Sequence, residues 1–511
     1  MTDRPIAPPP GEPDPQFRLG LEQLRTGQSA AAAATLQGVV EAAPDHGEAL
    51  IALGSAEMAL SQWSLAETHY RRALAVLPHH PAPLRNLGIL LGEHERHAEA
   101  LELADATLAV DPGHSQALLI HGNALTGLSR LEEALQSYGH AAGLKDVAYE
   151  ALTKLALTHA ALGQNAEALG RCGEAIALQP NLALAPFRRS LVRLLLRDFA
   201  GGWDDYEARL SVGAFVASSM SFYQPVMAKV VRHLPATDLP GRSIKLLGEQ
   251  GLGDQVMFAS MIADLARDAA KVTCVCDARL ERLFSASIEG VTFQGLGTPP
   301  VLSVAPDETL VAMGSLGRLY RRGVADFPGT PYLRARPEVR EAWAAQLGPR
   351  PKGLRIGLSW RGGVPSTRRG QRSLSLEQLA PVLDLPDCDF VSLQYGDAAA
   401  ELQALNTGRL APVRAFDPGA THDFEDLAGL IANLDVVVSV QTAVVHLAGA
   451  TGAECLTLVP HNPEWRYTAS GSTMPWYRSV QLFRQAEPGA WDPVVRNVES
   501  ALRRRLAERL A

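Results

Sequence analysis

Three glycines and two carboxylates, Glu249 and Asp254, follow a short apolar run within Leu246–Gln255. The run Ser243–Leu247 has the character of a buried parallel strand, and apolar residues at helical spacing continue to Ala269. Glycines at such a turn let the backbone approach a ligand, and the helix N-terminus offers free N–H groups and the positive end of the helix dipole. We therefore expect Gly251 and Gly253 to contact an anionic ligand.

Asp254 lies at the mouth of this expected helix. A carboxylate in that place can accept a proton from an attacking hydroxyl, as a general base does. It can equally do no more than cap the helix, because aspartate is among the preferred N-cap residues. Both alternatives remain open on these residues alone.

A second group of polar residues follows the apolar stretch Leu354–Trp360, where the next loop combines arginines with glycines. Guanidinium groups bind phosphate or carboxylate through two parallel hydrogen bonds. Because the loop follows the carboxyl end of an expected strand, we favour an anion site over a merely solvated basic loop. The residues expected to bind the anion are Arg361, Arg368, Arg369 and Arg372.

A third group lies where the expected strand Asp435–Val440 runs directly into a helix that begins with Gln441 and Thr442. A pyrophosphate there would meet backbone donors and the helix dipole. His446 lies one turn further on, on the same face as Thr442. It either contacts the ligand or serves only to pack the helix.

Two aromatic segments, Pro460–Tyr467 and Pro475–Tyr477, follow the last expected strand. Flat rings in such a loop can cover the apolar face of a sugar or base, and they can equally pack between domains. Asp387 and Asp389 have the Asp-x-Asp spacing that holds metal in some transferases, but they enter an expected strand and are interpreted as turn residues. We expect no metal site.

The composition favours a globular protein of roughly three domains, since the chain has 511 residues and 47% hydrophobic residues. A net charge of −8 argues against a general nucleic-acid binder. The five cysteines lack zinc or thioredoxin spacing, which fits a reducing, cytoplasmic location. Residues 1–14 are proline-rich and are expected to be a disordered lead, and no apolar run reaches membrane-spanning length.

Residues 15–210 repeat with a period of 34 residues. One column consists of prolines, a second of small residues and a third of alanines, as expected where paired helices approach closely and proline ends the second helix of each pair. The columns are Pro44, Pro78, Pro112 and Pro180, with Asp146 at the fourth position; Gly20, Gly54, Gly88, Gly122 and Ala156; and Ala32, Ala66, Ala100, Ala134 and Ala168.

This pattern resembles the tetratricopeptide repeat, through residues such as Gly54, Ala66, Tyr70, Ala73 and Pro78. We expect about five repeats, with a degenerate sixth unit near 191–210 acting as the cap. Such a solenoid offers a concave surface for a protein partner, with a purely structural spacer as the alternative.

After a connector at 211–240, strand and helix patterns alternate, so the expected fold class is α + α/β. Two αβ units in tandem, 241–340 and 341–511, suggest a ligand cleft between them. The expected strands are Ser243–Leu247, Lys271–Cys276, Val291–Gln294 and Thr309–Met313 in the first unit, and Leu354–Trp360, Asp389–Gln394, Val413–Phe416, Asp435–Val440 and Cys455–Val459 in the second. Helices are expected at Gln255–Ala269, Pro337–Leu347 and Trp491–Ala511.

The segments Gly248–Phe258 and Asp435–Gly452 together resemble the heptosyltransferase-type (family 9) glycosyltransferases of GT-B fold. The resemblance implies a nucleotide-sugar donor, inversion at the anomeric carbon, catalysis without a bound metal, and Asp254 as general base. Their strand-to-helix motif matches Thr442, Ala443 and His446 and extends the donor site to Ala443. The aspartate of the motif is replaced by Gln441, so the resemblance to the heptosyltransferase-type family does not imply which sugar is transferred.

The C-terminal aromatic and arginine motifs resemble the branch of that group fused to tetratricopeptide repeats. Bacterial flagellin glycosyltransferases have the same plan, which implies a protein acceptor on the repeats, flagellin as the best single acceptor, and a nonulosonic acid of the pseudaminic type, possibly CMP-linked, as the sugar. The alternatives are a lipopolysaccharide or small-glycan transferase, and a repeat scaffold with a degenerate transferase domain.

Overall fold

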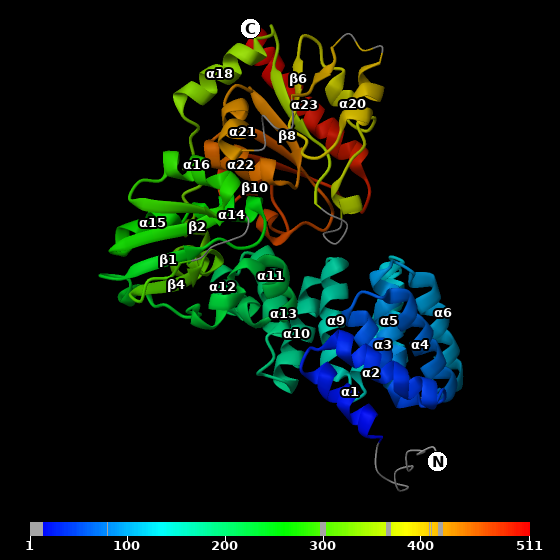
Figure 1. The fold of residues 1–511 in the computed structure, drawn as a ribbon. Helices are drawn as coiled ribbons and strands as arrows, with labels where there is room; N and C mark the ends of the chain where they lie inside the picture. Colours follow the sequence, from blue (N-terminus) through cyan, green and yellow to red (C-terminus); the bar gives the residue numbers. More distant parts are fainter. Residues whose placement is uncertain are drawn as a thin grey trace, which may run out of the picture. The chain divides into compact units, whose positions relative to one another are not determined.

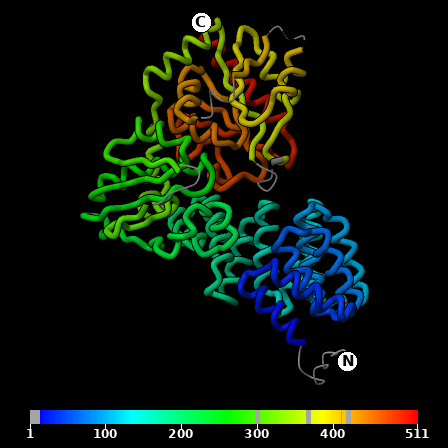
Figure 2. Tube along the Cα trace, in the orientation of Figure 1, coloured from blue at the N-terminus to red at the C-terminus, as the bar shows by residue number. Residues whose placement is uncertain are grey.

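A computed structural model describes residues 14–78, 80–296, 303–363, 369–407, 409, 411–416 and 423–511. The chain divides into two compact units, Met1–Gln179 and Pro180–Ala511. We call them the repeat unit and the α/β unit and describe each separately (Figures 1 and 2).

The described part of the repeat unit consists of helices that pair in sequence order. The pairs are α1 (Pro15–Arg25) with α2 (Ser29–Ala42), α3 (Gly47–Ala59) with α4 (Trp63–Val76), α5 (Pro81–Glu93) with α6 (His97–Val110), α7 (Ser115–Gly127) with α8 (Leu131–Ala142), and α9 (Ala148–Ala161) with α10 (Asn165–Leu178). Helices α2, α4, α6 and α10 each end two residues before a proline of the first column. The proline column therefore ends the second helices as expected.

Glycines of the second column lie where two helices approach closely, within a pair at Gly54 and Gly122 and between α5 and α7 at Gly88. A Cβ added at Gly54 would lie 2.7 Å from the ring of Tyr70, and one at Gly122 would lie 2.5 Å from the ring of Tyr138. The alanines of the third column are buried. The helix packing therefore requires small side chains at these positions, and this requirement explains why the 34-residue period can be recognised in the sequence.

The helix pair α11 (Leu184–Leu195) and α12 (Phe199–Tyr206) lies in the α/β unit, although we expected the solenoid to continue to residue 210. Trp203 explains the difference. Its ring packs edge-on against Phe258 and Trp465, and its Nε1 donates to the carbonyl oxygen of Arg321 at 2.8 Å. The segment after α12 contains η1 (Glu207–Ser211), α13 (Gly213–Ser219), η2 (Ser221–Lys229) and η3 (Ala236–Asp238).

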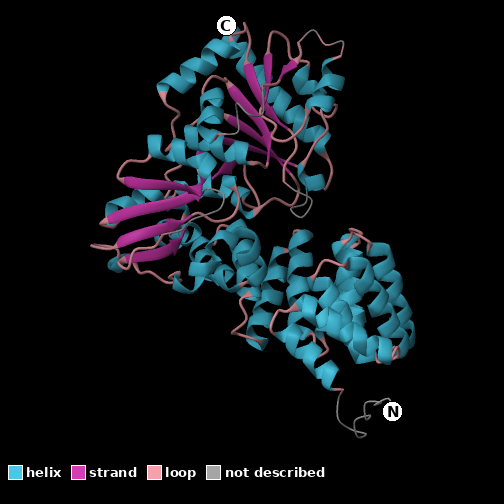
Figure 3. Cartoon of the chain, in the orientation of Figure 1, coloured by secondary structure: helices cyan, strands magenta, loops and turns pink. Residues whose placement is uncertain are grey.

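The first sheet of the α/β unit is fully parallel, with strand order β3-β2-β1-β4 (Figure 3). Its strands are β1 (Ser243–Leu247), β2 (Lys271–Asp277), β3 (Val291–Leu296) and β4 (Glu308–Ala312). The expected helix from Gln255 to Ala269 is divided into α14 (Leu252–Ala259) and α15 (Ile262–Asp268). At the break, the carbonyl oxygen of Ser260 accepts from Arg321 at 2.9 Å. Further helices are α16 (Ala278–Ser287) and α17 (Leu316–Tyr320), with η4 (Met313–Ser315) and η5 (Val324–Asp326).

The second sheet has the order β10-β11-β9-β8-β5-β6-β7 and is parallel except for β10. Its strands are β5 (Arg355–Ser359), β6 (Asp389–Ser392), β7 (Val413–Arg414), β8 (Val436–Val440), β9 (Cys455–Val459), β10 (Thr473–Met474) and β11 (Tyr477–Arg484). The sequence did not predict β10 and β11. Its helices are α18 (Pro337–Leu347), α19 (Ala380–Leu383), α20 (Ala399–Asn406), α21 (Phe424–Ile431), α22 (Ala443–Thr451) and α23 (Trp491–Leu510), with η7 (Arg369–Arg372) and η9 (Trp465–Tyr467).

One hydrophobic core joins α11, α12, the first sheet and one face of the second sheet. A separate core lies on the other face of the second sheet, beneath α23. A smaller core lies against the first sheet around Met220 and Tyr223. The shared core fixes the two sheets to each other within the α/β unit, and this places the strand ends of both sheets at one site.

Candidate functional site

Helices α14 and α22, which follow the carboxyl ends of β1 and β8, pack against each other at their first turns. A Cβ added at Gly253 would lie 3.1 Å from Cδ2 of His446 and 3.2 Å from Cα of Ala443. Gly253 therefore allows the close approach of two helices, a packing role that the sequence did not predict. Gly251 is the N-cap residue of α14, and a Cβ there would meet nothing closer than an oxygen of Asp254 at 3.8 Å.

Asp254 lies in the first turn of α14 and forms an ion pair with Arg466. The N-cap residue is Gly251, whose backbone N–H donates a hydrogen bond to the carboxylate of Asp254, so Asp254 also stabilises the start of the helix. Arg466 also donates to Oε1 of Gln250 at 3.1 Å. Gln250 has a φ of 64°, a left-handed conformation that is uncommon for a residue with a side chain. The turn after β1 is thus held by a residue of η9, in the loop that follows β9 of the second sheet.

The carboxyl group of Asp254 is nearly enclosed, with a side-chain exposure of 14%. Burial raises its pKa above the ordinary value, and the neighbouring Arg466 opposes that rise. A raised pKa brings a carboxylate closer to the range in which it accepts protons efficiently near neutral pH. The environment therefore suits a general base, provided that the carboxylate is free of its ion pair.

Arg466 and Glu464 lie in the loop that follows β9 and form a row of alternating charges with Asp254 and with Arg372 of η7. Glu464 lies 3.7 Å from Arg466, and Arg372 lies 3.6 Å from Glu464. The backbone N–H of Glu464 donates to Oε1 of Gln441 at 3.4 Å. Arg372, expected to bind an anion, is thereby connected through Glu464 both to Gln441 and to the Asp254–Arg466 pair.

Two buried primary amides lie at this edge of the second sheet. Gln441 follows β8, Gln485 follows β11, and each accepts through Oε1 from a backbone N–H of the loop after β9, Gln485 from His461 at 3.0 Å. The Nε2 atoms of both are buried and have no hydrogen-bond partner among the described residues. A buried donor without an acceptor is costly, so these atoms are suited to a bound ligand. Gln485 was not singled out for this role from the sequence.

Thr442 and His446 serve the structure of α22 and its packing. Thr442 is the N-cap residue, and its Oγ1 accepts from the backbone N–H of Val444 at 3.2 Å. His446 is buried, with Nδ1 lying 3.2 Å from the hydroxyl of Tyr477. Burial lowers the pKa of His446 to about 3, helped by the nearby Arg466, so the imidazole is neutral. Of the two alternatives for His446, these contacts support packing.

Only some of the arginines that follow β5 are connected to this site by described contacts. The guanidinium of Arg361 donates to the carbonyl oxygen of Asp397 at 2.8 Å and lies 3.3 Å from Glu401 of α20. Arg368 lies outside the described residues, and the backbone of Arg369 begins η7. Among these arginines, Arg372 is the one that the described contacts connect to Gln441.

The aromatic segments pack between the two sheets. Trp465 and Trp476 contact each other and Trp203, with ring centroids 5.6–6.5 Å apart. Both are buried. Of the two alternatives for these segments, interdomain packing is therefore the one that describes these tryptophans. Asp389 pairs with Arg355 at 2.8 Å and with Arg414 at 3.0 Å, and so has a structural ion-pair role.

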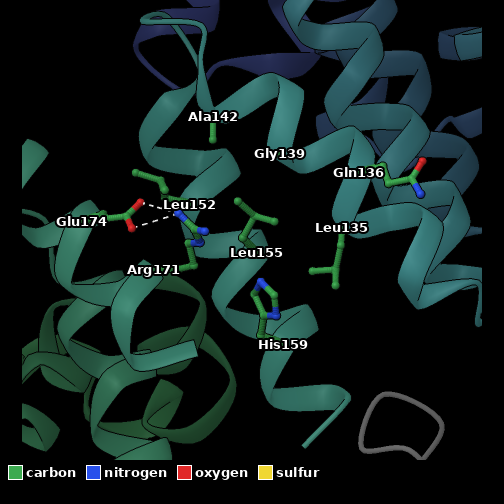
Figure 4. Close-up of a pocket in the computed structure, with 9 residues that line it drawn as sticks. All are labelled: Leu135, Gln136, Gly139, Ala142, Leu152, Leu155, His159, Arg171 and Glu174. Carbon is green, nitrogen blue, oxygen red and sulfur yellow. Dashed lines mark hydrogen bonds and ion pairs between the residues drawn. The ribbon is translucent and has the colours of Figure 1, made fainter. Parts of the chain in front are cut away.

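The repeat unit contains a separate pocket of about 520 Å³ formed by α8, α9 and α10 (Figure 4). Leu135, Leu152 and Leu155 make its apolar lining, and the Arg171–Glu174 ion pair lies at its side. Across the described residues, no three His, Cys, Asp or Glu side chains form a potential metal site. Over the same part of the chain, no helix has both the length and the apolar character needed to cross a membrane.

Comparison with known proteins supports the repeats directly. The tetratricopeptide repeat family matches residues 17–81 and 85–146. The chain is 26% identical over 510 residues to Protein FlbA of Caulobacter vibrioides (strain ATCC 19089 / CIP 103742 / CB 15), covering 95% of this chain and 83% of that protein. The N-terminal region therefore contains tetratricopeptide repeats, followed by an α/β region with parallel sheets.

Two solved structures resemble the chain over about a third of its length. A thermophilic tetratricopeptide protein of Thermus thermophilus is 22% identical and covers 35% of this chain and 97% of its own, with a TM-score of 0.31. A tetratricopeptide protein of Parabacteroides merdae ATCC 43184 is 18% identical and covers 39% and 77%, with a TM-score of 0.34.

Proposed function

We propose that this chain is a protein O-glycosyltransferase of GT-B type, which moves a sugar from a nucleotide donor to a serine or threonine of a protein held by the repeats. One observation carries the proposal. The first turns of α14 and α22 meet at Gly253. This contact brings Asp254 to the carboxyl-end edge of the second sheet, where Gln441 follows β8. Open α/β sheets bind ligands at the carboxyl ends of their strands.

The donor is an anion, and the second sheet supplies its site. The N-terminus of α22 offers backbone N–H groups, the Nε2 atoms of Gln441 and Gln485 offer buried donors, and Arg372 offers charge. Neutral amides can donate to a sugar carboxylate, whereas the aspartate expected in place of Gln441 would repel it. This supports a carboxylated sugar such as a nonulosonic acid, with a UDP-linked amino sugar as the second choice.

In the proposed reaction, Asp254 accepts the proton of the acceptor hydroxyl while the hydroxyl oxygen forms a bond to the anomeric carbon. The bond from that carbon to the phosphate oxygen of the donor breaks, and the nucleotide leaves with the electron pair. The attack from the opposite face inverts the anomeric centre. Arginine and backbone N–H groups stabilise the negative charge on the leaving phosphate, so no metal is required in this scheme.

The repeat unit supports a protein acceptor, because stacked helix pairs present extended surfaces to peptides and proteins. Flagellin is the acceptor that the family resemblance favours. A transferase acting on lipopolysaccharide or small glycans would have no evident use for such a surface.

Intact-mass analysis of flagellin and other secreted proteins from a deletion strain tests the proposal. We expect one protein to lose a mass equal to a sugar, and to regain it with the wild-type chain but not with Asp254→Asn. Asp435→Asn is the control, because Asp435 pairs with Arg350 and accepts from the backbone N–H of Arg355 at the amino end of β8, away from the carboxyl ends of the strands. Unchanged protein masses with an altered lipopolysaccharide would favour the glycan alternative, and restoration by Asp254→Asn would remove Asp254 from the reaction. Activity of the purified enzyme should also survive a chelator.

A further inference from the structure

Arg466 lies between acidic groups from both sheets of the α/β unit. Its Nε and Nη2 contact Oδ1 of Asp254, and its Nη1 lies 3.7 Å from Glu464. Its guanidinium also lies over the ring of Trp465, 4.9 Å from the centroid. The side chains of Arg466 and Asp254 are each 14% exposed, so this ion pair is weakly screened by solvent.

This contact engages one of the two carboxylate oxygens, Oδ1, of the proposed general base. A carboxylate whose lone pairs accept from a guanidinium is a poorer proton acceptor than a free one. In this arrangement, Arg466 therefore lowers the basicity of Asp254. Its partner comes from the loop after β9, which Gln441 and Arg372 contact through Glu464. The residues proposed to bind the donor thus adjoin the residue that restrains the base.

Resting on the proposed function, we infer that Arg466 is a donor-sensing positioning residue: the donor phosphate draws Arg466 away from Asp254 and so frees the base. A phosphate group can satisfy the same guanidinium with two parallel hydrogen bonds, and it carries at least as much charge as the carboxylate that it displaces. Before the donor binds, Asp254 and the phosphate compete for one cation. After it binds, the guanidinium stabilises the leaving group and Asp254 faces the acceptor.

Competition for Arg466 has a signature in nucleotide binding that does not require catalysis. Asp254→Asn removes the competitor, so the variant should bind the preferred nucleotide about tenfold more tightly than the wild type. Arg466→Gln removes the cation and should weaken binding by about tenfold or more. In the double variant, the gain from Asp254→Asn should vanish, because it acts through Arg466.

The experiment is a calorimetric titration of the full chain and these three variants with UDP, ADP, GDP and CMP. Asp435→Asn is the matched control, since it removes a partner of Arg350 and should leave affinity unchanged. Arg466→Lys keeps the charge in a less suitable shape, so its affinity should lie between those of the wild type and Arg466→Gln. If Arg466→Gln does not fold, Arg466→Lys replaces it in the single and double variants. Asp254→Asn should then increase nucleotide affinity less in the Arg466→Lys background than in the wild type.

The outcomes separate the inference from the proposed function. If a nucleotide binds but Asp254→Asn does not tighten its binding, the competition does not exist. A tightening that persists undiminished without Arg466 would show direct repulsion between Asp254 and the phosphate, and would overturn the inference equally. If none of the nucleotides binds any of these proteins, the proposed donor class is wrong, and the inference is overturned with it.

Discussion

Asp254 is the residue on which the proposed chemistry depends. Replacing its carboxylate with an amide keeps the shape of the side chain but removes the proton acceptor. General-base removal typically lowers a rate by about 10²–10⁴-fold, and we expect Asp254→Asn to lower the turnover number by that factor. Steady-state measurement of nucleotide release with saturating donor and acceptor checks this. Turnover within a few-fold of the wild type would remove Asp254 from the reaction.

His446 gives the α/β unit a specific dependence of stability on pH. Its pKa is about 3 in the folded protein, because burial disfavours the charged form, and about 6.5 in an unfolded chain. The unfolded state therefore binds the proton more readily below about pH 6.5. The contribution of the neutral His446 to the free energy of unfolding is complete above that pH. It should fall by up to about 1.4 kcal/mol for each pH unit between about pH 6 and the folded pKa.

Chemical denaturation at pH 7, 5 and 4 tests this expectation by comparing the wild type with His446→Gln. The variant should lose free energy of unfolding less steeply as the pH falls, whatever its stability at pH 7. His140→Gln is the control, because His140 is an exposed histidine of α8 in the repeat unit. Parallel slopes for the wild type and His446→Gln would contradict a neutral, buried His446.

Among the elements, the contact of α14 with α22 decides how the two sheets meet. Alanine at Gly253 would place its Cβ 3.1–3.2 Å from α22, and a larger side chain would force the helices apart. Overpacking of this kind costs roughly 1–3 kcal/mol, so Gly253→Val should lower the free energy of unfolding by about that amount. Gly251→Ala, only two residues away but with open space at its Cβ, should change stability little. Equal effects of the two substitutions in denaturation curves would argue against this packing role.

In the whole molecule, α11 and α12 belong with the α/β unit rather than with the repeats. Arg209, which follows α12, forms a fully buried ion pair with Glu249 at 2.7 Å. Removing one partner of a buried pair costs about 3–5 kcal/mol, and removing a buried tryptophan such as Trp203 costs about as much again. Domains are stable by only about 5–15 kcal/mol in total. We therefore expect the α/β unit to need this helix pair in order to fold.

Two fragments test this boundary. The fragment 180–511 should unfold cooperatively by itself, whereas the fragment 211–511, which begins where we expected the solenoid to end, should not fold. Circular dichroism during thermal unfolding distinguishes them. If the two fragments melt alike, α11 and α12 are dispensable to the α/β unit, and the boundary near residue 210 regains support.

The sequence alone determined the features that depend on local periodicity. The 34-residue repeat, most of the parallel strands and the terminal helix were predictable, because side chains alternate along a strand and recur along a helix within a few residues of each other. Pro44, Pro78 and Pro112 end helices through the geometry of their own backbone. Strand β10 was missed because it is a two-residue edge strand, and β11 because polar side chains interrupt its apolar residues.

The tertiary structure decided which of the candidate residues meet. Asp254 and Arg466 are 212 residues apart, and nothing in the spacing near either one specifies the other. The same holds for Gly253, because its neighbours in α22 are far away in the sequence and leave no room for a side chain. Local sequence fixes the conformation of a segment, but a contact between distant segments is set by how their buried faces pack into one core, and that information is distributed over the whole chain.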